Sequence, residues 1–299
     1  DKYFFEGLEH SAAGNLTKAK ECLEKSYAIV VKARGEADPK ASVICSQLAA
    51  FNKLMGNIPE SIEYCQKIIK ALVGTEREIS YELSIAYQML GETYMEQGKL
   101  RESLEMTKKA LDITYEIAGE DNQQTVLIYN QMGKLYDQLG DLKKAIKAKE
   151  FMLEILVRNY KANKNILNTP QEDLRAIAHT YIQIADNYLA GAEYKSSKEN
   201  FLRAETYLKK LKLEECADLW AIFYTKSGFL DESLELPDDA LANYEKAIKL
   251  YKEHNISNPT EAYALYTRLG NLLYAKEEYQ SALNYFLEGI LISRNTRGE

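Results

Sequence analysis

The sequence predicts an all-α protein built as an α-solenoid, and three observations predict it. Apolar residues recur at helical spacing; in the stretch 85–118, for example, Ala86, Met89, Leu90 and Tyr94 share one face of a 3.6-residue period. A small residue returns at a nearly constant interval along the whole chain. Only 5 prolines and 15 glycines occur in 299 residues, and most fall at expected turns. We therefore expect about seven helical hairpins and no strands.

The repeat is defined by two small residues, one in each helix of a hairpin. Counterparts of Gly91 occur at Gly7, Ala49, Gly133, Ala185, Gly228 and Gly270, separated in order by 42, 42, 42, 52, 43 and 42 residues. Twelve places after each comes a second small residue: Ala19, Ser61, Ser103, Ala145, Ser197, Ala240 and Ala282. A fixed period of this length is typical of an array of hairpins, each of which buries its second face only against a neighbour.

Each period is expected to form two antiparallel helices joined by a turn. The expected hairpins cover residues 1–36, 41–76, 83–120, 125–160, 173–211, 216–254 and 261–296. Their turns are expected at sites rich in glycine, asparagine or proline: Gly14-Asn15, Gly56-Asn57, Gln97-Gly98, Gly140-Asp141 and Leu236-Pro237. The sixth hairpin is the most degenerate copy. Together they make residues 1–299 one continuous array.

The fourth and fifth copies are separated by 52 residues instead of 42. The surplus falls in residues 161–170, a polar, asparagine-rich segment closed by Pro170, which predicts an exposed inter-repeat loop. The chain also starts partway through a helical pattern and stops inside a connection. Solenoids need a polar terminal cap, so this indicates a fragment of a longer chain, or a neighbouring subunit at the uncapped C-terminal end.

Composition limits the classes of partner. The formal charge is −7, from 45 acidic and 38 basic residues, and basic residues form no run of five, which argues against nucleic acid as the main partner. The four cysteines are scattered, as is typical of thiols in a reducing compartment. No apolar run reaches the roughly 20 residues that span a bilayer. We expect a cytoplasmic protein without membrane insertion.

Catalytic motifs are not found in the sequence. It contains no G-x-x-x-x-G-K, H-E-x-x-H or G-x-S-x-G pattern. His10, His179 and His254 lie far apart in sequence and in repeat phase, which argues against a shared metal site. We expect neither a metal nor a cofactor, and we expect that the protein is not an enzyme.

The repeated motif resembles the tetratricopeptide repeat. Leu90-Gly91-x-x-Tyr94 matches the first half of that motif, and Ala240-x-x-x-Tyr244-x-x-Ala247 matches the second. The usual repeat has 34 residues, whereas a 42-residue period with a Gly-x-x-Asp-Pro connection, here from Gly35 to Pro39, resembles the kinesin light chain and nephrocystin type. The resemblance implies a right-handed superhelix whose first helices line a concave, peptide-binding groove.

The resemblance also implies which positions face that groove: two and three residues before the small residue, and one and four after it. Among them we predict as peptide-binding residues Gln47, Gln88, Glu92, Asn130, Gln131, Lys134, Gln183, Asp186, Arg268 and Asn271. Side-chain amides recur there, and an amide can both donate to and accept from an extended peptide backbone. The Lys/Asn/Arg set with which chaperone-binding relatives hold a terminal carboxylate is not reproduced.

Three functions compete at this point. The first is a scaffold or adaptor that binds a peptide or helix of a partner protein, in a cytoskeletal, motor or ciliary assembly as the repeat type suggests. The second is a regulator of the bacterial peptide-pheromone receptor type, whose solenoids look similar. The third is the regulatory repeat domain of a larger enzyme.

Overall fold

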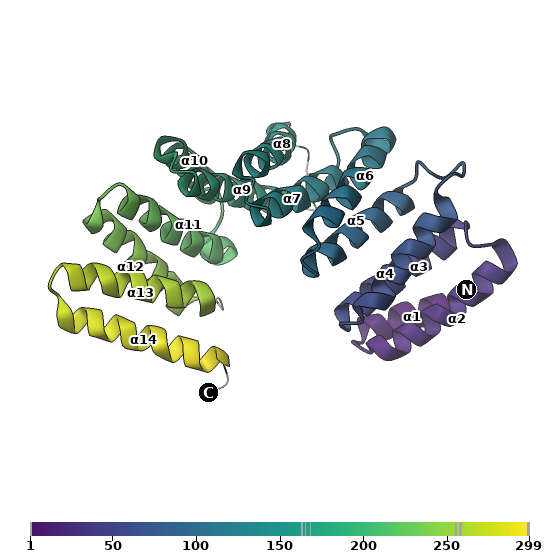
Figure 1. The fold of residues 1–299 in the computed structure, drawn as a ribbon, viewed down its shortest axis with the longest axis horizontal. Coiled ribbons are helices and arrows are strands. Elements are labelled where there is room, and N and C mark those ends of the chain that lie inside the picture. The colour runs from purple at the N-terminus through teal and green to yellow at the C-terminus, as the bar shows by residue number, and fades with distance from the viewer. Residues whose placement is uncertain are drawn as a thin grey trace. The chain divides into compact units, whose positions relative to one another are not determined.

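A computed structural model describes residues 2–162, 164, 166–167, 169–254, 256 and 259–297. These residues form fourteen α-helices and no strand (Figure 1). The helices are α1 (Lys2–Ala12), α2 (Leu16–Arg34), α3 (Pro39–Leu54), α4 (Ile58–Leu72), α5 (Tyr81–Glu96), α6 (Leu100–Ala118), α7 (Gln123–Gln138), α8 (Leu142–Lys161), α9 (Pro170–Ala190), α10 (Tyr194–Leu208), α11 (Leu213–Ser233), α12 (Pro237–Glu253), α13 (Pro259–Ala275) and α14 (Tyr279–Arg297). The all-α prediction is confirmed.

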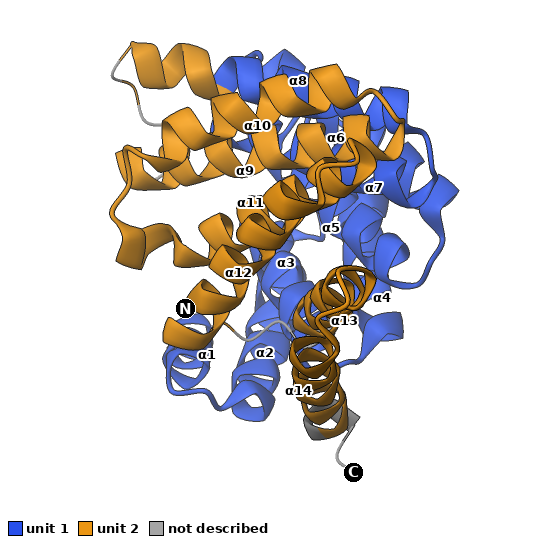
Figure 2. Ribbon diagram, turned by 90° about the vertical axis from the view of Figure 1, so that its left-hand side faces the viewer, with its two compact units in different colours: residues 1–155 blue, residues 156–299 orange. Residues whose placement is uncertain are grey.

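The chain divides into two compact units, Asp1–Ile155 and Leu156–Glu299, so that α8 contributes to both (Figure 2). Within each unit, consecutive helices pack in pairs, as α5 does on α6 and α11 on α12. The first helices of neighbouring pairs also touch: α3 packs on α5 and α5 on α7 in the first unit, and α9 packs on α11 in the second. That the whole chain forms one right-handed superhelix stays a prediction.

The small residue of each copy lies where the two helices of a hairpin approach most closely. A Cβ built on Gly91 would stand 2.8 Å from the hydroxyl of Thr107, and one on Gly270 would stand 2.5 Å from the ring of Phe286. In both cases the facing residue comes sixteen positions later. In two copies the second small residue adds a hydrogen bond: the hydroxyl of Ser103 donates to the carbonyl oxygen of Gly91 over 2.6 Å, and that of Ser197 donates to the carbonyl oxygen of Ala185 over 2.8 Å.

The turn inside each hairpin has one residue in the left-handed region, seven positions after the small residue. In the first four hairpins it is glycine: Gly14, Gly56, Gly98 and Gly140, with φ between 73° and 77°. In the last three it is Ala192, Glu235 and Glu277, with φ of 57°, 58° and 65°. The turn conformation is therefore kept where the glycine is lost, at the steric cost that a Cβ meets there.

The expected loop at 161–170 lies between the end of α8 at Lys161 and the start of α9 at Pro170. Its described part is held by Asp173, which is fully buried in the first turn of α9. The carboxylate of Asp173 accepts the backbone N–H groups of Ile166 (3.1 Å) and Leu167 (2.9 Å). Asn163, Asn165 and Asn168 lie outside the described residues.

The helices bury apolar faces against one another in several clusters. Leu23, Ile44 and Leu48 anchor one cluster in the first unit, and Tyr244 with Leu265 anchors another in the second. In the part of the chain that the structure describes, no helix has the length and apolar character needed to cross a bilayer.

Candidate functional site

The first helices of the second, third and fourth hairpins, α3, α5 and α7, bound a groove of about 300 Å³ in the first unit. Its walls are Lys53, Gln88, Glu92, Met95, Glu96, Leu127, Asn130, Gln131 and Lys134. The structure thus brings together five of the ten residues predicted to bind peptide: Gln88, Glu92, Asn130, Gln131 and Lys134.

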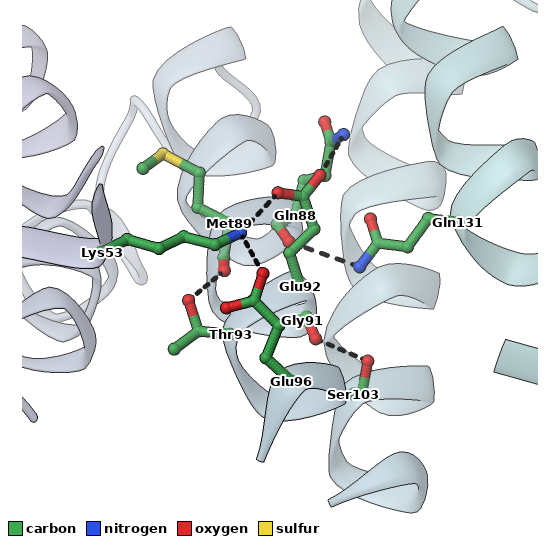
Figure 3. A network of polar contacts seen from close by, with 9 residues as sticks. All are labelled: Lys53, Gln88, Met89, Gly91, Glu92, Thr93, Glu96, Ser103 and Gln131. Carbon is green, nitrogen blue, oxygen red and sulfur yellow. Dashed lines mark hydrogen bonds and ion pairs between the residues drawn. The ribbon is translucent and has the colours of Figure 1, made fainter. Parts of the chain in front are cut away.

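The acidic wall of this groove is neutralised in part by Lys53, which reaches across from α3 to α5 (Figure 3). The ammonium nitrogen of Lys53 lies 3.3 Å from Oε2 of Glu92 and 3.1 Å from Oε1 of Glu96. Burial alone would lower the pKa of Lys53, but the hydrogen bond to Glu96 and the charge of Glu92 outweigh it, so the pKa is raised. Lys53 therefore stays charged and committed to these two carboxylates.

Gln88 is hydrogen-bonded through both its backbone carbonyl group and its side-chain amide. Its backbone carbonyl oxygen accepts from Nε2 of Gln131 at 3.5 Å (Figure 3). Its side-chain amide donates to Glu92 at 3.3 Å and accepts from Gln124 of α7. Gln88 thus ties α5 to α7 and is less free for a ligand than its position in the repeat suggests.

Gln131 is the most buried polar residue of the groove, with 4% of its surface exposed. Its amide lies beside Gly91, where an added Cβ would stand 2.9 Å from Nε2. The amide oxygen, Oε1, has no hydrogen-bond partner within the described residues. An unpaired buried acceptor costs about 1–3 kcal/mol. A hydrogen-bond donor that reached Oε1 of Gln131 would therefore be stabilised at this wall of the groove.

Asn130 and Lys134 form the remaining polar edge of the groove on α7. Among the described residues, neither makes a hydrogen bond or ion pair, and Lys134 is exposed. Apolar surface lies alongside, from half-buried Met95 and from Leu127, which is 39% exposed. The groove therefore presents an amide and a cation that pair with no described residue, beside a strip of apolar surface.

In the second unit, the predicted residues are mostly paired with their own neighbours. Asp186 of α9 lies 2.8 Å from the ammonium of Lys226 on α11. Arg268 of α13 pairs with Glu232 of α11, and its guanidinium carbon stands 4.1 Å from the ring centre of Phe229. A hollow of about 220 Å³ adjoins these pairs, and its walls are Ile222, Thr225, Lys226, Phe229, Glu261 and Ala264.

The other three predicted residues, like Asp186 and Arg268, line neither hollow. Gln47 is half-buried on α3, Gln183 lies 3.4 Å from the ring of His179 on the same helix, and Asn271 is exposed on α13. Conversely, four residues that line the groove of the first unit are not in the sequence-based set. Lys53 and Met95 stand four residues after a small residue, at positions expected to face the groove, whereas Glu96 and Leu127 stand at none of the expected positions. Their spacing could have found them, because Glu96 follows Glu92 by four residues and Leu127 precedes Asn130 by three, which keeps each on the same helix face.

Comparison with family models identifies the repeat. Two models, both described as tetratricopeptide repeat, match residues 81–155 and 264–299. The chain contains tetratricopeptide repeats. The groove of the first unit is formed in part by the matched repeats, since α5 and α7 lie within residues 81–155.

Solved tetratricopeptide repeat structures share this fold. A putative kinesin light chain from Podosopora anserina, with nearly identical repeats, is 16% identical with a TM-score of 0.56, over 70% of this chain and 94% of that one. The apo form of RapI is 15% identical with a TM-score of 0.61, over 99% and 98% of the two chains. A signal transduction ATPase with a tetratricopeptide repeat sensor from Pyrococcus horikoshii is 16% identical with a TM-score of 0.71, over 96% of this chain and 41% of that one.

Among curated proteins, none matches the sequence. Tetratricopeptide repeats support a protein-interaction scaffold in general terms. At 15–16% identity the structural likeness concerns the fold. Within the described ranges, moreover, no three His, Cys, Asp or Glu side chains gather as they would around a metal ion.

Proposed function

We propose that the groove between α3, α5 and α7 binds an extended segment of a partner protein. The observation that carries this is the contrast within the groove. Lys53 pairs with Glu92 and Glu96, whereas the side chains of Asn130 and Lys134 have no hydrogen-bond or ion-pair partner among the residues that the structure describes. Polar groups that the fold does not use, beside apolar surface in a preformed hollow, are typical of a binding site.

The chemistry of the free groups indicates the kind of segment. The amide of Asn130 can pair with both the N–H and the carbonyl group of an extended backbone. The cation of Lys134 favours an acidic side chain nearby, and Leu127 with Met95 favours an apolar one. Gln131 supports the same interpretation, because a donor that reaches its buried amide oxygen would remove the cost of leaving it unpaired.

The wider setting stays a prediction. A role in a cytoskeletal, motor or ciliary assembly rests on the repeat type, and the shared fold with a putative kinesin light chain comes with 16% identity. The pheromone-receptor alternative and the alternative of a regulatory domain in a larger enzyme also stay predictions. The groove chemistry is the same under all three, so it is tested first.

A displayed library of random peptides, selected against the purified protein, tests the proposal. The selected peptides are then measured by calorimetry against the variant Asn130→Ala/Lys134→Ala. Each lost hydrogen bond should cost about 0.5–1.5 kcal/mol, so we expect the double variant to bind roughly tenfold more weakly. Both side chains lie at the groove surface without partners, so the free energy of unfolding should change by less than about 0.5 kcal/mol.

The matched control is Lys143→Ala/Asn284→Ala, which removes the same two residue types from exposed positions on α8 and α14. This control should bind like the unmodified protein. If the selected peptides bind the groove variant and the control equally well, or if the library yields no binder, then the groove is not a peptide site.

A further inference from the structure

The first unit contains a second, larger cavity that shares no residue with the groove. It has a volume of about 570 Å³ and lies between the α4–α5 connection, α5 and α6. Leu83 and Tyr87 of α5 are buried along it, and Ile113 of α6 is half-buried. Ile79, in the connection, adds an apolar wall that is 57% exposed.

The cavity adjoins the connection at which α4 ends one turn earlier than its counterparts α2 and α6. In register with the repeat, residues 73–76 correspond to 31–34 and 115–118, which are helical at the ends of α2 and α6. α4 has 15 residues instead of the 19 of those two helices. The chain leaves the helix at Val73 and continues through Gly74, whose φ is 76°. Four residues of this connection line the cavity: Thr75, Glu76, Glu78 and Ile79.

The wall made by this connection is fixed by hydrogen bonds. The hydroxyl of Thr75 donates to the carbonyl oxygen of Leu72 at 2.6 Å and accepts the N–H of Arg77 at 3.1 Å. The side chain of Arg77 pairs with Glu82 at 2.9 Å and donates to the carbonyl oxygen of Ala37. Arg77, the basic residue of the connection, is therefore paired with Glu82 and Ala37 and does not line the cavity.

The rim of the cavity is acidic and uncompensated. Glu76, Asp112 and Glu116 are exposed and make no hydrogen bond or ion pair within the described residues. Asp112 and Glu116 are four residues apart on one helix face, a spacing at which like charges repel. Among the described residues that line the cavity, Lys109 is the one cation, and its ammonium lies 2.8 Å from Glu105 and over the ring of Tyr87.

We propose that this cavity is a second docking site, which takes an apolar side chain of a partner polypeptide flanked by lysine or arginine residues. The apolar floor accepts the side chain, and the rim supplies three carboxylates with no cation of their own. Such a partner differs in charge from the segment proposed for the groove, which places an acidic side chain near Lys134. One chain can then hold two different segments on separate surfaces of its first unit.

Synthetic peptides test this by NMR on protein labelled at the isoleucine methyl groups, with Ile79→Val and Ile113→Val used to assign the two signals. The probe is Lys-Lys-Leu-Lys-Lys, and its matched peptides are Glu-Glu-Leu-Glu-Glu and Lys-Lys-Gly-Lys-Lys. We expect the probe to shift both methyl signals in a saturable way. The acidic peptide should leave them unchanged, and the peptide without leucine should bind at least about tenfold more weakly.

Neutralising the rim with Asp112→Asn/Glu116→Gln should weaken binding of the probe about tenfold, with a smaller loss at high salt. The control Glu21→Gln/Glu150→Gln neutralises two carboxylates that are exposed on α2 and α8, and it should keep the affinity. The variant Asn130→Ala/Lys134→Ala should keep it too, which separates this site from the groove. The proposal is wrong if the probe leaves the signals unmoved, if either matched peptide binds equally well, or if the control loses as much as the rim variant.

Discussion

The backbone of Gly228 lies directly against the ring of Tyr244: a Cβ added to Gly228 would stand 2.3 Å from Cε1 of that ring. Tyr244 is fully buried, so the ring has no open space into which it can move. At Gly133, by comparison, the nearest atom is Cγ of Lys149 at 3.0 Å. A lysine stem adjusts its torsions more easily than a buried ring can.

This comparison predicts that Gly228→Ala destabilises the second unit by about 1–3 kcal/mol through overpacking, despite the better helix propensity of alanine. Gly133→Ala should stay within about 1 kcal/mol of the unmodified protein. Chemical unfolding of both variants measures the difference. Equal stabilities would mean that the ring of Tyr244 can yield.

The sequence predicted these contacts only in part. The 42-residue interval identified each small residue, and hence where two helices meet. Nothing in the interval says what faces the small residue, and the partners sixteen positions later differ in kind: Thr107, Lys149, Tyr244 and Phe286. Their packing depends on three-dimensional shape, which a one-dimensional pattern of small residues does not carry.

The turn of the sixth hairpin offers a stabilising change. Glu235 has a φ of 58°, a conformation that costs a residue with a Cβ about 1–2 kcal/mol. Glu235→Gly should therefore raise the free energy of unfolding of the second unit by roughly 0.5–1 kcal/mol, since the added entropy of the unfolded chain offsets part of the gain.

Thermal unfolding of Glu235→Gly checks this prediction. A second variant, Gly98→Ala, makes the opposite kind of change, from glycine to a residue with a Cβ, at the same turn position of the third hairpin. This second variant should destabilise the first unit, because Gly98 has a φ of 73°. A lower unfolding midpoint for Glu235→Gly would contradict the prediction. It would show that the side chain of Glu235 stabilises the folded protein by more than its positive φ destabilises it.

Asp173 should control the order of the connection before α9. Its carboxylate is the acceptor for the N–H groups of Ile166 and Leu167, so Asp173→Ala leaves both donors unpaired and should cost about 1–3 kcal/mol. Hydrogen exchange at these two amides should accelerate more than exchange in the middle of α9. Asp173→Asn, which keeps one oxygen acceptor, should show a smaller change at the same amides.

The pair between Arg175 and Asp218 predicts a dependence on pH. Burial alone would raise the pKa of Asp218, but the bidentate bond from Arg175 (2.8 and 3.2 Å) lowers it below its ordinary value of 3.8. A carboxyl whose pKa is depressed in the folded protein stabilises it above the unfolded value, and that contribution is lost as the pH falls through the folded value.

Asp218→Asn should therefore be less stable than the unmodified protein by a constant amount above about pH 5, of roughly 0.2–1 kcal/mol because the pair is partly exposed. The difference should shrink below pH 3.8 as Asp218 becomes protonated. Urea unfolding of both proteins between neutral pH and pH 3 measures it. A difference that stays constant down to pH 3 would contradict the depressed pKa.

The position of the candidate groove could be predicted from the sequence, but the pairing of its charged side chains could not. The repeat phase placed Gln88, Glu92, Asn130, Gln131 and Lys134 on neighbouring helices, and they do line one hollow. It could not show that Lys53 neutralises Glu92, because a pair between residues 39 positions apart depends on how two helices pack. The larger cavity could not be predicted from the sequence for a related reason. The repeat pattern shows where each copy begins, but not that α4 ends one turn before α2 and α6 do.

The ion pairs between successive first helices make the hairpins unlike one another. Lys53 with Glu92, Asp186 with Lys226, and Glu232 with Arg268 each join neighbours. The order of the charges is reversed after the first pair. Lys226 and Arg268 both stand two residues before a small residue, whereas their carboxylate partners Asp186 and Glu232 occupy different positions of the repeat. Identical hairpins would fit against one another in any order, but hairpins that carry different charged residues at their contacts are not interchangeable. Deleting one hairpin, or exchanging two, would leave charged side chains without their partners on the neighbouring hairpin. The charged residues therefore specify the order of the hairpins along the chain.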